Sequence, residues 1–226
     1  MLPSASSEDG IGGFGAPMPS RTETVAARLR DAITGGRLPA GERLSLDGLA
    51  RQFGVSRMPV RDALKILESE GLVRIYPYRG IEVSRLDADD IAELFGLREV
   101  LEQRAAVRGV PLLTETDLAA MEALLREMDA LVEDSDQDRW LDLNNRFHAI
   151  INTASGWPRL VEMITVLRTN VDRYVRAYLL ELGRAGPQRQ HWELLDACRR
   201  RDPEGAATVI TGHLRDTADA LIARLA

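Results

Sequence analysis

The strongest constraint on the fold is one stretch of the sequence, residues 46–83, in which two short helical patterns are followed by two alternating ones. Apolar residues recur at helical spacing in the first two segments, at Leu46, Leu49, Ala50 and Phe53 and then at Val60, Leu64 and Leu67. Between them, Gly54 can adopt the left-handed conformation that ends a helix, and Ser56 can cap the next one. Two helices joined by so short a break indicate a helix-turn-helix motif, whose second helix enters the major groove of DNA.

The second of these helices carries arginines on its outer face. Arg57 and Arg61 are four residues apart, so they project from one side of the helix. An arginine can donate two hydrogen bonds to a guanine edge or to a phosphate. The alternating runs LVRIYP and IEVS then flank Tyr78, Arg79 and Gly80, which predicts a two-stranded hairpin. Two helices followed by a hairpin predict a winged helix.

The order of these motifs resembles the DNA-binding domain of the GntR family of bacterial transcription regulators. The resemblance rests on GVSRMPVRDALKILESEGLV, on LPAG at residues 38–41 before it, and on the YRG of the wing after it. It implies a set of DNA-contacting residues in the second helix and the wing: Ser56, Arg57, Met58, Arg61, Arg79 and Gly80. Met58 departs from the family pattern, in which a small hydroxyl residue is common, so a different base preference is expected.

After residue 84 the alternating patterns stop and helical periodicity continues. Helices are predicted over residues 87–109, 114–132, 137–154, 158–182, 188–200 and 203–225, with a break at 183–187. The first of them is expected to bury a face formed by Ile91, Leu94, Leu97 and Leu101. Six helices with short connections indicate an all-α bundle. With one more helix at 22–34, the fold class is mainly α: an N-terminal winged helix-turn-helix with a two-stranded wing, followed by a C-terminal helical bundle.

Two segments of the bundle resemble the effector-binding FCD domain of the FadR-like subgroup of GntR regulators. They are LREVLEQRAA at residues 97–106 and NRFHAIINTASGWPRL at residues 145–160. The resemblance implies a DNA-binding domain at residues 21–84 and an effector-binding and dimerisation domain at residues 85–226. Residues 1–20 are rich in Gly, Ser, Pro and Ala and show no periodicity, which predicts a disordered tail.

The distribution of charge agrees with this division. The chain has a net charge of −6, but residues 21–84 hold 11 basic against 8 acidic side chains, whereas residues 85–226 hold 18 against 25. A basic excess confined to one domain suits phosphate attraction there, and the acidic second domain disfavours a structural nucleoid protein. The single cysteine, Cys198, excludes an internal disulfide and suits a reducing cytoplasm. No apolar run approaches the length needed to span a membrane, so a cytoplasmic location is expected.

The three histidines are the candidate metal ligands. His148, His191 and His213 each share a helix face with apolar or amide neighbours, so all three are expected to point into the bundle. Imidazoles from separate helices are a common way to build a divalent-metal site, although a single histidine on such a face is more often a hydrogen-bonded core residue. The FCD resemblance implies a ligand set of Asn144, His148, His191 and His213. Three nitrogen ligands favour a transition metal such as zinc or nickel over magnesium.

A metal with open positions beside an arginine forms a site for a small carboxylate. The candidates for this effector-binding role are Arg98 first, then Arg173 and Tyr174. The alternative for Arg98 is a helix-surface ion pair with Glu102, one turn later. A different class of function, a mononuclear metal hydrolase with Glu102 as the base, is disfavoured because no loop in the sequence looks able to position a substrate.

These observations predict a homodimeric, ligand-responsive transcription regulator rather than an enzyme. Two winged helices would read the half-sites of a near-palindromic operator in double-stranded DNA. A small organic acid bound in the helical domain would change how the two winged-helix domains of the dimer are placed relative to each other, and thereby change the affinity for DNA.

Overall fold

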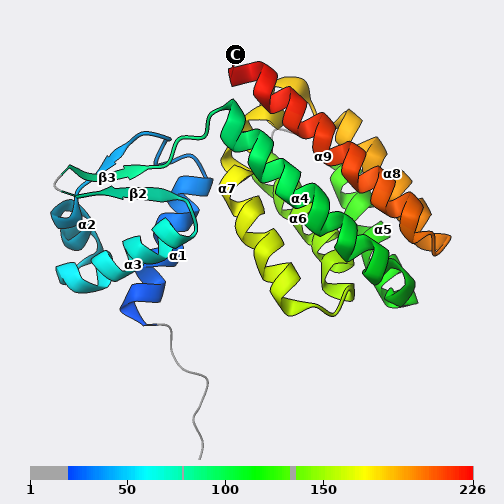
Figure 1. Cartoon of the computed structure of the whole chain (residues 1–226), viewed down its shortest axis with the longest axis horizontal. Coiled ribbons are helices and arrows are strands. Elements are labelled where there is room, and N and C mark those ends of the chain that lie inside the picture. Colours follow the sequence, from blue (N-terminus) through cyan, green and yellow to red (C-terminus); the bar gives the residue numbers. More distant parts are fainter. Residues whose placement is uncertain (1–19, 78, 133–135, 226) are drawn as a thin grey trace, which may run out of the picture.

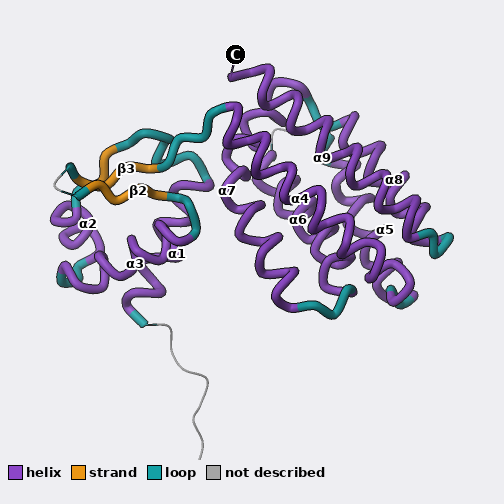
Figure 2. Tube along the Cα trace, in the orientation of Figure 1, coloured by secondary structure: helices purple, strands orange, loops and turns teal. Residues whose placement is uncertain are grey.

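The computed structural model describes residues 20–77, 79–132 and 136–225, and within these ranges the side chains at 173, 177 and 180–182 are left undescribed. Figure 1 shows a small N-terminal domain of helices and strands beside a larger C-terminal domain. In Figure 2, every strand lies in the N-terminal domain. The mainly helical fold class predicted from the sequence is therefore confirmed. The tail predicted at residues 1–20 lies outside the described residues except for Ser20.

The N-terminal domain is a winged helix-turn-helix. Its elements are α1 (Arg21–Thr34), β1 (Arg43–Leu44), α2 (Leu46–Phe53), α3 (Arg57–Ser69), β2 (Val73–Tyr76) and β3 (Gly80–Val83). Gly54 ends α2 in the left-handed conformation, with φ of 64°, as predicted. Ser56 occupies the N-cap position of α3, but its side chain makes no capping hydrogen bond. The domain core forms where α1, α2 and α3 pack together and against the sheet, and its largest buried side chains include Leu29, Ile33, Leu64, Leu67 and Leu72.

The wing has three strands rather than the predicted two. The strands are antiparallel in the order β1-β3-β2, with Arg43 opposite Glu82 and Leu44 opposite Ile81. A run of two residues is too short to show the alternation by which a strand is recognised in a sequence. Leu44 is 7% exposed, so the extra strand also anchors the wing to the core.

Within the residues that the structure describes, the C-terminal domain is a bundle of six α-helices. These are α4 (Ala88–Gly109), α5 (Glu115–Ala130), α6 (Gln137–Ala154), α7 (Pro158–Leu182), α8 (Ala185–Arg199) and α9 (Pro203–Leu225), with a short 3₁₀ helix, η1 (Val110–Leu112), after α4. Asp87 and Thr114 begin α4 and α5 with capping boxes, in which cap and third helical residue satisfy each other's backbone N–H groups. Helix α8 starts three residues earlier than predicted, within the expected 183–187 break.

The buried face of α4 matches the predicted one only in part, with Ile91 buried and Leu94 packed against the core as expected. The helix buries Ile91, Phe95, Arg98, Glu102 and Ala105 on the bundle side. Leu97, by contrast, is 48% exposed. The apolar periodicity was misleading because two charged residues, Arg98 and Glu102, occupy inward positions and neutralise each other there. The true inward face is rotated by about one residue from the leucine stripe.

Helix α7 connects the two domains. The hydroxyl of Tyr174 accepts a hydrogen bond from the backbone N–H of Leu86, at 2.9 Å. The Asn170 side chain donates to the carbonyl oxygen of Glu70, at 2.7 Å, at the end of α3. Glu70 is itself held by Arg30 of α1, whose Nε donates to the carboxylate at 2.8 Å. Within the described residues, no helix has the length and apolarity required to cross a membrane.

Candidate metal centre and DNA-binding face

Three histidines from three different helices meet in the C-terminal domain. His148 of α6, His191 of α8 and His213 of α9 each offer a ring nitrogen within 4.8 Å of the others. The Nε2 atoms of His148 and His191 are 3.2 Å apart. Two nitrogens bound to one tetrahedral zinc, each at about 2.0–2.1 Å, would be separated by about 3.3 Å. The His148–His191 pair therefore has the spacing that a metal requires, and the ring nitrogen of His213 lies within 4.8 Å of both.

The outer nitrogens of two of these rings face glutamine oxygens. Nδ1 of His213 lies 2.9 Å from Oε1 of Gln190, and Nδ1 of His191 lies 3.5 Å from Oε1 of Gln188. An amide oxygen only accepts, so Nδ1 carries the proton in each pair. The Nε2 atoms then present lone pairs, which is the arrangement that outer hydrogen bonds impose on metal-binding histidines.

The cluster is electrostatically neutral near pH 7. Burial is the main cause that lowers the pKa of all three rings; Arg168 lowers all three further, and Arg98 lowers those of His148 and His213. The pKa of His213 falls to about 4, and those of His148 and His191 lie well below 6.5. A neutral imidazole is the form that binds a metal, so no proton has to be removed first.

The depressed pKa values predict an acid-sensitive stability for metal-free protein. Unfolded histidine titrates near pH 6.5, whereas the folded ring of His213 resists protonation down to about pH 4. Between these values the unfolded chain binds more protons, so the free energy of unfolding should fall as the pH drops, by up to about 1.4 kcal/mol per pH unit for each histidine. Above pH 7 the three rings should contribute no slope.

Urea denaturation in chelator at pH 7.5, 6.5 and 5.5 measures this effect. His213→Gln should show a shallower loss over the same range, because one of the titrating groups is gone. An equal slope in the variant and the wild type would mean that His213 does not titrate as its surroundings imply.

A buried ionic network lies beside the histidines. Arg98 donates through Nε to Glu102, at 2.8 Å, and the two side chains are 7% and 0% exposed. Nη1 of Arg168 lies 3.5 Å from the other carboxylate oxygen of Glu102. Although burial works to raise the pKa of Glu102, the two arginines hold it below its usual value. Glu102 is therefore a fixed anion and a poor proton acceptor, unlike the base that a hydrolase would need.

Two buried N–H donors near the histidines make no hydrogen bond. Nη1 of Arg168 lies 3.5 Å from Oε2 of Glu102 without a hydrogen bond between them, and the indole Nε1 of Trp140 is likewise unsatisfied within the described part of the chain. Both residues line the cavity that also contains His148 and His213. An unsatisfied buried donor is costly, so such atoms mark a place where an acceptor group can bind. The cavity volume of about 30 Å³ is enough for a metal ion or a water molecule, but not for an organic acid.

The predicted site residues are not all placed together. Asn144 and Arg98 line the cavity with His148 and His213, and Asn144 is 7% exposed. Tyr174 lies at the domain junction instead, where its hydroxyl bonds the linker. The side chain of Arg173 is outside the described set. The Arg98–Glu102 pair expected on the helix surface does form, but it is buried.

The cavity also contains two charged residues that the sequence did not single out. Arg168 and Asp172 are one turn apart on α7, and both line it. Burial raises the pKa of Asp172, against the opposing effect of Arg168 and Arg98. One signal was available in the sequence, because residues 168 and 172 have the four-residue spacing of a single helix face.

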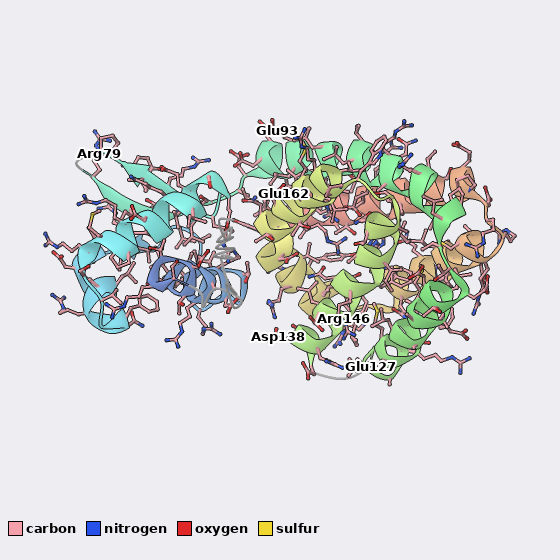
Figure 3. The ribbon with its side chains drawn as sticks, turned by 90° about the horizontal axis from the view of Figure 1, so that it is seen from below. Arg79, Glu93, Glu127, Asp138, Arg146 and Glu162 are labelled. Carbon is pink, nitrogen blue, oxygen red and sulfur yellow. The ribbon has the colours of Figure 1, made fainter. Side chains whose placement is uncertain are left out.

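The DNA-binding candidates form an exposed set on α3 and the wing. Met58 is 61% exposed, and Ser56, Arg61 and Gly80 are also exposed. Figure 3 shows Arg79 at the tip of the wing, far from the helical domain. Arg57 differs from the others because its guanidinium forms a two-point ion pair with Asp47 of α2. To contact DNA, the Arg57 guanidinium must therefore break at least one of its two hydrogen bonds to Asp47 or use an N–H group that Asp47 leaves free.

Comparison with known proteins agrees with both halves of the structure. Residues 21–83 match the family "Bacterial regulatory proteins, gntR family", and residues 93–216 match the FCD domain. The HTH-type transcriptional regulator McbR of Escherichia coli is 32% identical over 190 residues, which cover 82% of this chain and 86% of McbR. An HTH-type transcriptional regulator of Streptomyces ambofaciens is 31% identical over 209 residues, covering 86% of this chain and 82% of that protein.

The solved structure of E. coli McbR/YncC has the same fold as this chain. The two superpose with a TM-score of 0.79 at 27% identity, over 92% of this chain and 100% of that one. Family and relatives are transcription regulators rather than enzymes, which excludes the hydrolase alternative. The chain therefore belongs to the GntR family, and it is a DNA-binding transcription regulator with an FCD domain behind its winged helix.

Proposed function

We propose that this regulator senses a small carboxylate through a divalent transition metal, zinc or nickel, held in its FCD domain. His148, His191 and His213 bind the metal, and Asn144 supplies a neutral oxygen as a fourth ligand. One observation carries the proposal: ring nitrogens of three imidazoles from three helices lie within 4.8 Å of one another, and two of these rings, those of His148 and His213, line the cavity. A histidine that only fills a core needs one hydrogen-bond partner, and nothing requires three of them to meet. FCD domains bind metals in some members of the family.

The donors around the cavity support an anionic effector. Arg168 and Trp140 line it, each with a buried N–H group that makes no hydrogen bond within the described residues, and Arg98 adds a second cation. Glu102 neutralises only part of this charge, since one carboxylate is shared between two guanidinium groups. A carboxylate bound to the metal and to Arg168 would supply the missing acceptor.

Binding of an organic acid requires the cavity to enlarge. Helix α7 forms one wall of the cavity through Arg168, Asp172 and Val175. The same helix contacts the winged-helix domain through Asn170. A shift of α7 would therefore reach the end of α3 by way of Glu70. This is a physical route by which a ligand with different affinity for two arrangements would change DNA binding.

The DNA side of the proposal uses the exposed residues of α3 and the wing. Ser56, Arg57, Met58 and Arg61 would contact the major groove, and Arg79 and Gly80 the adjacent backbone or minor groove. Two copies, joined through the domain at residues 85–226, would read a near-palindromic operator in the cytoplasm, where the chromosome lies. The basic excess of residues 21–84 favours this contact.

Melting of metal-loaded protein against a panel of small carboxylates tests the proposal. Zinc or nickel alone should raise the melting temperature, and a selective acid should raise it further. A ligand at a hundred times its dissociation constant adds about 2.7 kcal/mol, or roughly 5–11 °C for a chain of this size. Arg168→Gln should lose most of the response to the acid and keep the response to the metal.

Arg146→Gln is the matched control for this experiment. Arg146 lies on α6 with an exposed ion pair to Asp142, so it should respond as the wild type does (Figure 3). Acid responses that survive chelation would place the pocket away from the histidines. If neither zinc nor nickel changes the melting temperature, the three histidines are core residues and do not bind a metal.

A further inference from the structure

The first residue of α3 is held by an acidic residue of the helix before it. Arg57 begins α3, and its guanidinium donates through Nε to Oδ1 and through Nη2 to Oδ2 of Asp47, in the first turn of α2. The side chains of Arg57 and Asp47 are 64% and 48% exposed, so the pair lies on the surface of the winged-helix domain. In Figure 1, α2 lies at the end of that domain farthest from the helical bundle, so the pair is remote from the histidine cluster.

The geometry of this ion pair leaves one edge of the guanidinium free. A guanidinium carries five N–H groups, and Asp47 accepts from two of them, Nε–H and one N–H of Nη2, along the side of the group. The end edge, formed by Nη1 and the second N–H of Nη2, makes no hydrogen bond within the described residues. Two parallel N–H groups on such an edge match the O6 and N7 acceptors of guanine. Asp47 therefore leaves Arg57 with a complete fork for a base.

The other arginine on the outer face of α3 is not held in this way. Arg61 is exposed one turn after Arg57 and makes no ion pair in the part of the chain that the structure describes. A free arginine loses the entropy of several rotatable bonds when it binds a base, whereas a side chain that is already held has lost that entropy before DNA arrives. A held fork also points in one direction, so it favours one base pair over the alternatives.

The two helices that carry the pair are anchored in the core of the winged-helix domain. The Ser45 hydroxyl caps α2 by accepting a backbone N–H at 3.2 Å. Leu49 of α2 and Val60 of α3 are 7% and 0% exposed, and both belong to the same buried cluster. Side chains on packed helices are placed more precisely than side chains on loops, so Asp47 stays within reach of Arg57.

A carboxylate in the first turn of a helix also has a simpler role. It suits the positive end of the dipole of α2, but that role requires only a charge near the helix start. The dipole does not explain why both oxygens of Asp47 bind one guanidinium, or why that group belongs to the first residue of α3. The hydrogen bond from Arg57 is the main cause that lowers the pKa of Asp47, so the carboxylate stays ionised at neutral pH. A carboxylate beside the DNA-contacting residues repels phosphate, so its presence there needs a compensating benefit.

We infer that Asp47 is a positioning residue for base reading, which holds the side edge of the Arg57 guanidinium and directs the end edge to one guanine in the major groove. The inference rests on the proposed function for the contact between Arg57 and DNA, and it deepens that function by naming the base and the residue that orients the contact. Asp47 raises the preference for one base pair and lowers the general attraction to phosphate. Its effects on base preference and on non-specific affinity therefore have opposite signs.

Replacement of Asp47 by asparagine separates these two effects. Asp47→Asn keeps the size of the side chain but removes its charge and one acceptor oxygen. The preference for guanine at the position that Arg57 reads should fall by about 2- to 12-fold, the cost of fixing one long side chain. The affinity for unrelated duplex DNA should rise instead. Fluorescence anisotropy of the full-length protein, at one metal content for every variant, measures both on the selected operator, on the operator with that guanine replaced by adenine, and on a scrambled duplex.

Arg57→Ala identifies the base pair and tests the reading role by itself. The position that Arg57 reads is the one at which this variant loses its guanine preference, by about 5- to 160-fold. In the Arg57→Ala background, Asp47→Asn should not change the base preference further and should strengthen binding to every sequence equally. If Arg57→Ala loses preference at no position, the proposed reading role fails and the inference fails with it. If Arg57→Ala loses the preference and Asp47→Asn keeps it, the inference alone fails.

Asp31→Asn is the matched control for the change of charge. Asp31 is exposed on α1 of the same domain and makes no ion pair among the residues that the structure describes, so this variant should keep the wild-type base preference. Circular dichroism confirms that each variant is folded, which is expected because the Asp47–Arg57 pair is exposed. A guanine preference that rises in Asp47→Asn would show that Asp47 masks Arg57. That result, or an unchanged preference at any overall affinity, would overturn the inference.

Discussion

His191→Ala is expected to weaken zinc or nickel binding by more than about 100-fold, because changes even to groups that only orient a ligand cost 10- to 100-fold. His191 is the central ring of the cluster: its centroid lies 5.1 Å from that of His148 and 4.9 Å from that of His213. It is 1% exposed, so neither water nor a surface side chain is positioned to replace it. Isothermal titration of chelator-treated protein measures the affinity.

Two further variants make this result specific. His191→Gln keeps much of the volume and a hydrogen-bonding group, and should lose metal binding equally. Cys198→Ala removes the only cysteine, which is buried on the same helix but outside the histidine cluster, and should bind metal as the wild type does. Wild-type affinity in both histidine variants would show that the metal is bound elsewhere.

Glu102→Ala is expected to destabilise the protein by about 3–5 kcal/mol, the usual cost of leaving a buried charge without its partner. The carboxylate is fully buried and shared between Arg98 and Arg168, so its loss strands two guanidinium groups in the bundle. The corresponding fall in melting temperature is roughly 6–20 °C. Urea denaturation at pH 7 measures the free energy of unfolding.

Glu99→Ala is the matched control on the same helix. Glu99 pairs with Arg215, whose side chain is 66% exposed, so this change should cost no more than about 1 kcal/mol. If the two variants lost the same free energy of unfolding, the buried ion pair would contribute no more to stability than the exposed one. Glu102→Gln, which keeps the shape and removes the charge, should fall between Glu102→Ala and the wild type.

The sequence predicted those parts of the fold that local chemistry determines. Helices α6, α7 and α9 begin and end at the predicted residues, because Pro158 and Pro203 start two of them and short polar or glycine-containing breaks separate them. The inward direction of the three histidines was predicted from their apolar or amide neighbours, and their convergence was implied by the FCD resemblance. Leucine-rich periodicity alone was misleading in α4, where Leu97 is exposed and the charged residues Arg98 and Glu102 take inward positions.

The remainder depends on contacts between elements that are distant in sequence. Nothing near residue 168 in the chain shows that its guanidinium meets Glu102, which is 66 positions earlier on another helix. Likewise, the Arg57–Asp47 pair depends on the angle between α2 and α3. Charged residues at inward positions are read as surface residues unless their partners are known, so the place of Arg168 in the cavity was not predicted, whereas Arg98 was a candidate from the sequence.

Operator binding of the wild-type protein, followed by fluorescence anisotropy on a duplex selected from random sequence, tests the central claim most directly. We predict that metal together with the carboxylate chosen by melting changes the operator affinity by about 5- to 150-fold, the usual range of allosteric coupling, and that chelation abolishes the change. Arg61→Ala, which should weaken operator binding by about 1–3 kcal/mol, shows that specific reading is being measured. An operator affinity that is the same with and without metal and carboxylate would contradict the claim that this FCD domain controls DNA binding by sensing a metal-bound acid.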